Sequence, residues 1–314
     1  MDRLRTVLPT LIGVTLAAGA VAVLRTELRL VTWHGLAADV ANVPGARLTL
    51  ALLLTAANYA VLTGYDFLAF AYLGKDLPWR RIVMTSLLAF AVSNNVGLAM
   101  VAGASVRYRF YARWGVTAEE LSRIVFSYLV TFWLGLLLIG GIRLARNPLG
   151  WVLMSACIGY LAACALRLPP IRLFRLQLPL PSARLAAAQL ATSVVQWVSA
   201  AAVLQVLLPS GTVPFPALLS AFLAAHLVGI ASHVPGGVGV FEGLMVLLLK
   251  PFISSAALLP VLIVYRAIYY LLPLSIAAVA LVADELHHRR SQGPTKTSRS
   301  VSSTRNTSRA VRWR

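Results

Sequence analysis

Long apolar runs recur along the chain, and each of the clearest is close to the roughly 20 residues that an α-helix needs to cross a bilayer. There are six of them, at residues 8–24, 48–72, 124–142, 149–166, 183–208 and 257–283. Polar segments separate them. The pattern predicts an all-α polytopic membrane protein with about six full spans.

Two further apolar regions, 82–106 and 216–249, are broken by polar and helix-breaking residues. The first contains "SNNVG" at 93–97, and the second contains "SHVPGGVG" at 232–239. Non-helical backbone is tolerated inside a bilayer only where protein or a water-filled cavity satisfies it. The limbs on either side of each break are too short to span. We therefore expect two re-entrant helical hairpins, each entering and leaving the membrane on one side.

Charge places these elements relative to the membrane. The chain is 59% hydrophobic and only 12% charged, whereas soluble domains average nearer a quarter charged. Cytoplasmic loops of membrane proteins are rich in Lys and Arg. The basic residues that mark such loops here are Lys75, Arg80, Arg81, Arg107, Arg109, Arg113, Arg167, Arg172, Arg175 and Arg184.

This placement puts both termini in the cytoplasm and predicts a multi-pass protein of the inner (plasma) membrane. The hairpin at 82–106 then opens to the cytoplasm, and the hairpin at 216–249 opens to the outside. Arg143, Arg146 and the arginines of loop 25–47 fall on the outer side in this scheme and count against it.

The two hairpins also resemble each other. A shift of 132 residues aligns seven identities within twenty positions, starting with Leu87 on Leu219 and ending with Val106 on Val238. Three spans separate the two copies, and an odd number inverts the second copy. Inverted repeats with broken helices are typical of transporters. The alternative is two unrelated kinks in Ala- and Leu-rich sequence.

The end of the chain differs in composition from the rest. The net charge is +18, and eight of the 28 basic residues follow Glu285, with no acidic residue after it. Such a Ser-, Thr- and Arg-rich segment cannot build a core. We expect a transmembrane domain over 1–285 and a disordered basic cytoplasmic tail over 286–314. The tail is expected to lie on anionic lipid rather than to bind nucleic acid.

Ionisable residues inside predicted spans are candidates for function, because each is costly there. Arg266 lies near the middle of the span 257–283, and its guanidinium could bind a lipid phosphate through two bonds. The alternative is a structural ion pair, for which Glu242 is the expected partner.

The break in the second hairpin supplies further candidates. Pro235 suits the first turn of a helix, and Gly236, Gly237 and Gly239 allow close approach to the backbone. The half-helix that begins there directs N–H groups and the positive end of its dipole toward the protein interior, which favours anions. The alternative is that these glycines serve only helix packing.

Five more residues complete the predicted substrate-binding set. Arg107 and Arg109 lie near the cytoplasmic surface, where they bind arriving phosphate or snorkel to lipid heads. Asp66 meets a cationic head group, or it pairs with Arg80 or Arg107. Asn95 either contacts substrate or satisfies broken backbone, and Tyr270 either contacts substrate or packs. These five are Asp66, Asn95, Arg107, Arg109 and Tyr270.

No catalytic, metal-binding or cofactor-binding residue is predicted. The polar residues of the spans show no spacing of Ser, His and Asp that suits nucleophilic catalysis. Cys157 and Cys164 lie about 10 Å apart along one predicted helix, so they cannot bridge each other. No Walker motif indicates ATP binding. An enzyme is therefore not expected.

Several motifs together resemble the transmembrane region of the lysylphosphatidylglycerol synthase family. They are "YDFLAFAYLG" (65–74), "GASVRYRFY" (103–111), "SHVPGGVGVFEG" (232–243) and "VYRAIYYLLPL" (264–274). The resemblance runs from about residue 48 to 285. Full-length members, such as the multiple peptide resistance factor, join this region to a soluble aminoacyltransferase. Too few residues follow Glu285 for such a domain, so we expect a stand-alone membrane-domain member.

The resemblance implies a flippase that moves a phospholipid or a lipid-linked substrate between leaflets. The partner would be a membrane phospholipid with an anionic or aminoacylated head group. A second hypothesis is a membrane protein that does not transport and instead assists a separate lipid-modifying or glycosyl-transferring enzyme. An oligomer is compatible with either hypothesis.

Overall fold

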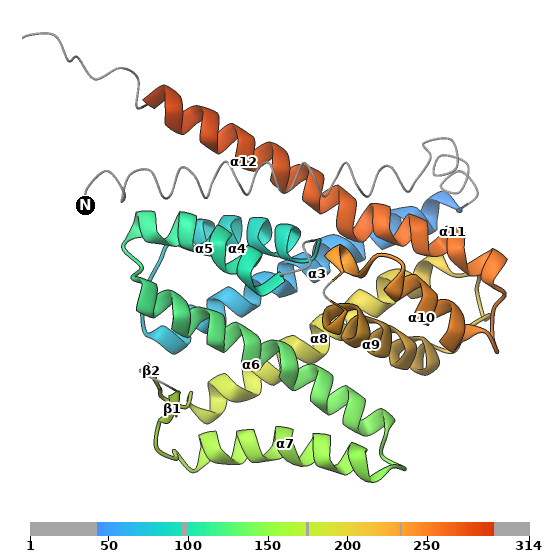
Figure 1. The fold of residues 1–314 in the computed structure, drawn as a ribbon, viewed down its shortest axis with the longest axis horizontal. Helices are drawn as coiled ribbons and strands as arrows, with labels where there is room; N and C mark the ends of the chain where they lie inside the picture. Colours follow the sequence, from blue (N-terminus) through green and yellow to red (C-terminus); the bar gives the residue numbers. More distant parts are fainter. Residues whose placement is uncertain (1–42, 96–98, 174–175, 233, 292–314) are drawn as a thin grey trace, which may run out of the picture.

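The structure, a computed structural model, describes residues 43–95, 99–173, 176–232 and 234–291, and these form a bundle of helices (Figure 1). Five helical segments within them are long and apolar enough to cross a membrane. They are α3 (Gly45–Leu73), α6 (Ala118–Arg143), α7 (Pro148–Ala165), α8 (Ala183–Leu207) and the continuous segment Ser255–Leu286. The all-α membrane class is confirmed. The sixth predicted span, 8–24, lies outside the described residues.

Two pairs of shorter helices occupy the broken apolar regions. The first pair is α4 (Trp79–Ser93) and α5 (Ala99–Tyr111), which continues into a 3-10 turn, η1 (Ala112–Trp114). The second pair is α9 (Phe215–Ala231) and α10 (Val240–Leu249), joined through a 3-10 turn, η2 (Pro235–Gly237). The helices of each pair pack against each other. None of the four reaches the length of a span.

The last span is built from three pieces. Helix α11 (Ser255–Arg266) passes into a π-helical turn, η3 (Ala267–Leu271), and then into α12 (Leu272–Ser291). Helix α12 extends beyond Glu285, so the first residues of the predicted tail are helical rather than disordered. The remainder of that tail, 292–314, lies outside the described residues.

One short strand pair interrupts the helices of the described chain. Between α7 and α8, β1 (Ile171–Leu173) pairs antiparallel with β2 (Leu176–Leu178), with Ile171 opposite Leu178. The sequence analysis did not predict it.

Helices α3 and α8 run side by side in opposite directions. Arg47, at the start of α3, donates to the carbonyl of Leu208, just after α8 ends, at 3.0 Å. At the other end, the Tyr72 hydroxyl donates to the carbonyl of Pro179, shortly before α8 begins, at 2.8 Å. Because these helices pack more extensively than any other two elements, they form the centre of the bundle.

Helix α6 runs parallel to α8. The Gln189 amide donates to the Ser127 hydroxyl at 3.1 Å, and further along both helices the Gly135 N–H donates to the Ser193 hydroxyl at 3.0 Å. The small side chains at this contact let the two backbones approach closely, as is common between helices in membranes.

The bundle thus has two ends. We call the end with the C-terminus of α3 and the N-terminus of α6 the first end, where Lys75 pairs with Glu120 at 2.8 Å. Asp284 of α12 lies there as well, paired with Arg113 at 3.1 Å. The opposite end, where α3 begins and α8 finishes, is the second end.

Each short-helix pair has both of its outer ends at one end of the bundle. Helix α4 follows α3 and α5 leads into α6, so this hairpin opens at the first end. Helix α9 follows α8 and α10 leads into α11, so this hairpin opens at the second end. Re-entry from opposite sides of the membrane, and the inverted repeat, agree with this arrangement and stay predictions.

Candidate functional site

The π-helical turn η3 lies in the middle of the last span and receives hydrogen bonds from other helices. Pro273 has no N–H, so it cannot donate to the carbonyl of Tyr269 four residues before it. The Tyr59 hydroxyl of α3 donates to that carbonyl at 3.3 Å. The Asn95 amide, at the tip of the first hairpin, donates to the carbonyl of Tyr270 at 3.4 Å. Single π-turns of this kind are frequent at functional sites.

The second hairpin reaches the same turn through a histidine. The His226 ring of α9 makes a 2.9 Å hydrogen bond from Nε2 to the Tyr270 hydroxyl, and its Nδ1 lies 3.0 Å from the carbonyl of Phe222. Tyr270 is therefore bonded to the first hairpin through its carbonyl and to the second through its hydroxyl. Two segments that lie far apart in the sequence meet at this residue.

Arg266, the residue before the π-turn, holds the tip of the second hairpin. Its Nε donates to Oε1 of Glu242, and its Nη1 donates to the carbonyl of Gly236 at 3.2 Å. The other oxygen of Glu242 accepts the N–H of Gly239 at 2.7 Å. The guanidinium also lies 5.5 Å from the centre of the Tyr270 ring. The ion pair that the sequence analysis named as an alternative for Arg266 is present.

The tip itself requires glycine. Gly236, Gly237 and Gly239 have φ angles of 61°, 63° and 78°, in the left-handed region that other residues rarely adopt. A Cβ on Gly237 would lie 3.5 Å from the Cα of Gly229, an ordinary contact, so the backbone conformation and not lack of space requires glycine here. Pro235 opens the 3-10 turn and is exposed.

The positive end of α10 faces an internal carboxylate. Glu242 accepts the N–H of Gly239, the N-cap residue, so this oxygen occupies the position that the sequence analysis assigned to a head group. The helix dipole and Arg266 both favour the negative charge of Glu242. Any head group that binds there must therefore compete with this side chain.

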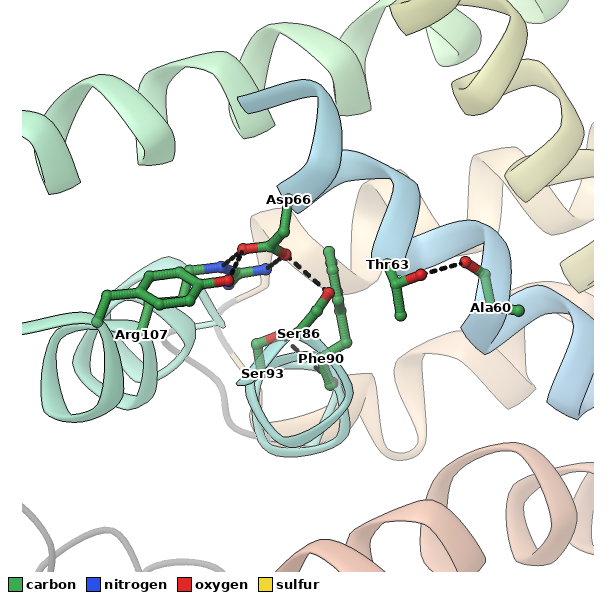
Figure 2. Close-up of polar contacts among 8 residues, drawn as sticks. Ala60, Thr63, Asp66, Ser86, Phe90, Ser93 and Arg107 are labelled. Carbon is green, nitrogen blue, oxygen red and sulfur yellow. Dashed lines mark hydrogen bonds and ion pairs between the residues drawn. The ribbon is translucent and has the colours of Figure 1, made fainter. Parts of the chain in front are cut away.

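The first hairpin carries a different ion pair, which is closed to solvent. Arg107 donates to Asp66 through Nε at 2.8 Å and through Nη2 at 2.7 Å (Figure 2). The hydroxyls of Ser86 and Tyr111 donate to the same carboxylate at 2.7 and 2.9 Å. Of the two partners that the sequence left open for Asp66, Arg107 is the one it has.

Arg109 lies two residues further on and pairs with another helix. Its Nη2 donates to Asp284 at 2.8 Å and to Glu285 at 2.9 Å. Arg113 pairs with Asp284 as well, at 3.1 Å. Arg107 and Arg109 are thus both buried against carboxylates, and the structure does not bring either one to the tip of the second hairpin. The sequence analysis missed the role of Asp284 and Glu285.

The two ion pairs differ in exposure. The side chains of Arg107 and Asp66 are 3% and 1% exposed, whereas those of Arg266 and Glu242 are 10% and 18% exposed. Gly239 and Pro235 beside the second pair are also exposed. The pair at the tip of the second hairpin is the accessible one of these two.

Polar side chains continue from the π-turn into the centre of the bundle. The Tyr269 hydroxyl donates to Oδ1 of Asn58 at 2.6 Å, and the Asn58 amide donates to the carbonyl of Gln196 at 2.8 Å. The Tyr65 hydroxyl lies 3.4 Å from Oε1 of Gln196. Tyr265, next to Arg266, has a buried hydroxyl without a hydrogen-bond partner. A buried polar group without a hydrogen-bond partner is energetically costly. The Tyr265 hydroxyl is therefore a further reason to regard the residues around Arg266 as a functional site.

No metal centre accompanies these residues in the described part of the chain. No group of three or more His, Cys, Asp or Glu side chains is placed there to hold an ion. Cys157 and Cys164 are free thiols buried on α7.

These features define a polytopic helical membrane protein in which two short-helix hairpins and a π-turn bring ionisable side chains together inside the bundle. The chain belongs to the family described as the lysylphosphatidylglycerol synthase TM region, which matches residues 10–277. The match begins well before residue 48, where the motif resemblance began.

Relatives agree with this assignment. The chain is 34% identical to the uncharacterized protein slr0712 of Synechocystis sp., over 92% of this chain and 95% of the relative. It is 29% identical to the inner membrane protein YbhN of Escherichia coli, over 74% and 78% of the two chains. It is 26% identical to the phosphatidylglycerol lysyltransferase of Staphylococcus aureus, over 74% of this chain but only 29% of that enzyme.

Proposed function

We propose that the protein moves a phospholipid between the leaflets of the cell inner membrane, and that Arg266 binds the phosphate of the head group. The observation that carries this proposal is the position of Arg266. Its guanidinium contacts the tip of the second hairpin, and its side chain is 10% exposed. A guanidinium can bind phosphate through two parallel bonds. Arg107 and Arg109 also pair with carboxylates and are less suited, because their side chains are only 3% and 1% exposed, against 10% for Arg266.

The path of the head group follows the polar layer. The two hairpins open at opposite ends of the bundle and both contact Tyr270, so a head group would pass from one hairpin to the other near this residue. The acyl chains would remain in the lipid beside the bundle. This division is favourable because only the polar part of the lipid needs protein contacts in the membrane.

The relatives support the substrate class. One of them is named a phosphatidylglycerol lysyltransferase, and the matched region accounts for 29% of that protein. Another is named an inner membrane protein. We therefore propose an anionic glycerophospholipid, or its aminoacylated form, as the substrate.

The test is a lipid translocation assay in proteoliposomes with fluorescent phosphatidylglycerol. Arg266→Gln should abolish translocation while the protein still inserts and folds. Arg266→Lys should restore only part of it, since an ammonium is a point charge without the planar fork. Arg123→Gln is the matched control, because Arg123 is partly exposed and pairs with Glu119 away from the hairpin tip. Translocation by Arg266→Gln at the wild-type rate would rule out Arg266 as the phosphate site.

A structural role for the ion pair predicts a different result. If Arg266 and Glu242 only stabilise the hairpin, either single change to Gln should lower thermal stability, because each strands a charge. The double variant Arg266→Gln, Glu242→Gln should then recover both stability and translocation. Full activity in the double variant would remove Arg266 from the substrate site and leave the backbone donors of the tip as the candidate.

A second candidate is a membrane partner of a separate lipid-modifying enzyme. It is favoured by the Staphylococcus aureus relative, in which the region similar to this chain is a minor part of a protein named as a transferase. Under this hypothesis the purified protein would bring down one enzyme in equal amounts and would move no lipid in liposomes. Translocation by the protein alone would exclude it.

A further inference from the structure

The guanidinium of Arg266 already holds an anion. Glu242 accepts its Nε, and the carbonyl of Gly236 accepts its Nη1. A lipid phosphate that makes the two-bond contact through Nε and Nη2 needs the position that Glu242 occupies at Nε. Lipid binding at this edge of Arg266 therefore requires that Glu242 give up its place.

The displaced carboxylate then has little compensation. Its remaining bond is the one from the N–H of Gly239 to Oε2, at 2.7 Å. Its side chain is only 18% exposed, and a charge left without its partner in such a place is strongly unfavourable. A carboxylic acid without charge keeps an oxygen that accepts the Gly239 N–H, so protonation removes the cost without breaking this bond.

We propose, on the basis of the function inferred above, that Glu242 is a proton-binding site and that binding of a lipid phosphate to Arg266 is coupled to uptake of one proton by Glu242. The proton comes from water and adds to a carboxylate oxygen, and no other bond is made or broken. Before binding, the site holds Arg266 and the carboxylate of Glu242. After binding, it holds Arg266, the lipid phosphate and neutral Glu242, so its net charge stays zero.

This coupling supplies a source of energy for lipid movement. A proton and a lipid occupy the site together, and each raises the affinity for the other because linkage is reciprocal. A difference in proton concentration between the two sides of the membrane would then favour lipid binding on one side and release on the other. The lipid is thus transported together with a proton.

Among the described residues, three groups beside Glu242 bear on such a dependence. Arg266 of α11 faces Glu242 directly and does not lose its proton in proteins. His226 of α9 is bonded to the Tyr270 hydroxyl and its ring lies 4.9 Å from that of Phe241, the residue before Glu242. Tyr270 itself faces the guanidinium. His226 is thus the neighbour that the experiment must separate from Glu242.

Asp66 is a poor candidate for the same role. Its carboxylate accepts two bonds from Arg107 and one each from Ser86 and Tyr111, and it is almost completely buried. No second anion can reach Arg107 without dismantling this set. The two ion pairs therefore differ in function, with exchange assigned to the pair at the second hairpin.

The experiment measures binding rather than transport. The protein is placed in nanodiscs of phosphatidylcholine, and the affinity for fluorescent phosphatidylglycerol is measured between about pH 5 and 8, the interval in which unperturbed histidine titrates. If one proton is taken up, affinity falls by up to about tenfold per pH unit as pH rises. Proton uptake on lipid addition is also measured directly in weakly buffered solution, which requires no variant.

Four variants assign the proton. Glu242→Gln should bind lipid with an affinity that no longer changes with pH, because its side chain is permanently neutral. His226→Gln should keep the dependence. Glu119→Gln, a change of the same kind at an exposed position, should behave like the wild type. Arg266→Gln should weaken binding by about 10–100-fold at every pH.

The outcomes separate the two proposals. If the wild type binds lipid without pH dependence and without proton uptake, proton coupling is wrong, even where Arg266→Gln still abolishes binding. A dependence that survives in Glu242→Gln, or that disappears in His226→Gln, likewise overturns the assignment. If Arg266→Gln binds as tightly as the wild type, the phosphate site itself is wrong. Coupled binding without translocation in liposomes would refute the transport function and leave the proton site in place.

Discussion

Arg107 and Arg266 each pair with a carboxylate, but their surroundings differ. Arg107 makes both of its described bonds to Asp66, and hydroxyls fill the remaining acceptor positions of that carboxylate. Arg266 divides its bonds between Glu242 and the carbonyl of Gly236, near exposed residues. A fully satisfied pair resists exchange, whereas a partly exposed pair can open at lower cost.

Removal of one partner from the buried pair should therefore damage the fold. We expect Asp66→Asn to lower the free energy of unfolding by about 3–5 kcal/mol, because Arg107 would keep its charge without a carboxylate. The midpoint of thermal unfolding in detergent measures this. Glu119→Gln is the control and should shift the midpoint little, since Glu119 is 64% exposed. Equal midpoints for Asp66→Asn and the wild type would show that this pair does not stabilise the fold.

Single residues show how far sequence alone can lead. Glu242 could be named as the partner of Arg266 because a charge in a predicted span needs a partner and few acidic residues lie nearby. The pairing of Arg109 with Asp284 and Glu285 could not be found this way. Asp284 and Glu285 follow Arg109 by 175 and 176 positions in the sequence. They lie near the predicted membrane surface, where a charged residue does not need a buried partner. Only the packing of α12 against the first hairpin, where it contacts α4, brings them together.

Helix packing within the bundle depends on small residues at defined positions. A Cβ on Gly135 of α6 would lie 2.4 Å from the hydroxyl and 2.7 Å from the carbonyl carbon of Ser193 on α8. Backbone atoms cannot move away as a flexible side chain can. Gly135 is therefore fixed by the approach of two spans, and not by its own conformation.

We expect Gly135→Ala to destabilise the protein by about 1–3 kcal/mol through this clash. Gly159→Ala on α7 is the matched control, because a Cβ there meets nothing within 4 Å. Thermal unfolding of both variants in the same detergent decides the matter. Gly159→Ala should keep or slightly raise stability, because Ala favours a helix more than Gly does. Equal midpoints in the two variants would show that the contact with Ser193 does not exclude a side chain at position 135.

The tip of the second hairpin offers a test of its conformation. Gly237 has a φ of 63°, which costs about 1–2 kcal/mol for a residue with a Cβ. Gly237→Ala should therefore slow lipid translocation while the bundle still folds, since η2 belongs to no span. Gly243→Ala in α10 is the control, as it has open space around it. Unchanged translocation by Gly237→Ala would show that the tip geometry is not needed for transport.

At the level of elements, apolar length and breaks predicted most of the fold. The hairpins expected at 82–106 and 216–249 correspond to α4–α5 and α9–α10, with boundaries shifted by a few residues. The π-turn η3 was not predicted, although Pro273 carried a signal for it. A proline inside an apolar run frees a carbonyl one turn earlier, and a donor such as Tyr59 on another helix can then bond there.

The directions of the helices define the topology of the whole molecule. Helix α3 and the segment α11–α12 run from the second end to the first, and α6 and α8 run from the first end to the second. The loops of the described chain that are rich in Lys and Arg gather at the first end, although Arg47, Arg143, Arg146 and Lys250 lie toward the second. The rule that basic loops face the cytoplasm then predicts that the first end is cytoplasmic.

Cysteine labelling in intact cells tests this topology. We expect Ser210→Cys and Pro251→Cys to react with a membrane-impermeant maleimide from outside, because these exposed residues follow α8 and α10 at the second end. Asp76→Cys, exposed in the loop after α3, should react only after the membrane is opened. The native Cys157 and Cys164 are buried, so wild-type protein gives the background.

If Ser210 and Pro251 label from opposite sides, α9 and α10 together cross the membrane, and the second hairpin does not re-enter it. A head group could then not be received at its tip in the way proposed, and Arg266 and Glu242 would have to be reassigned as a structural pair between spans.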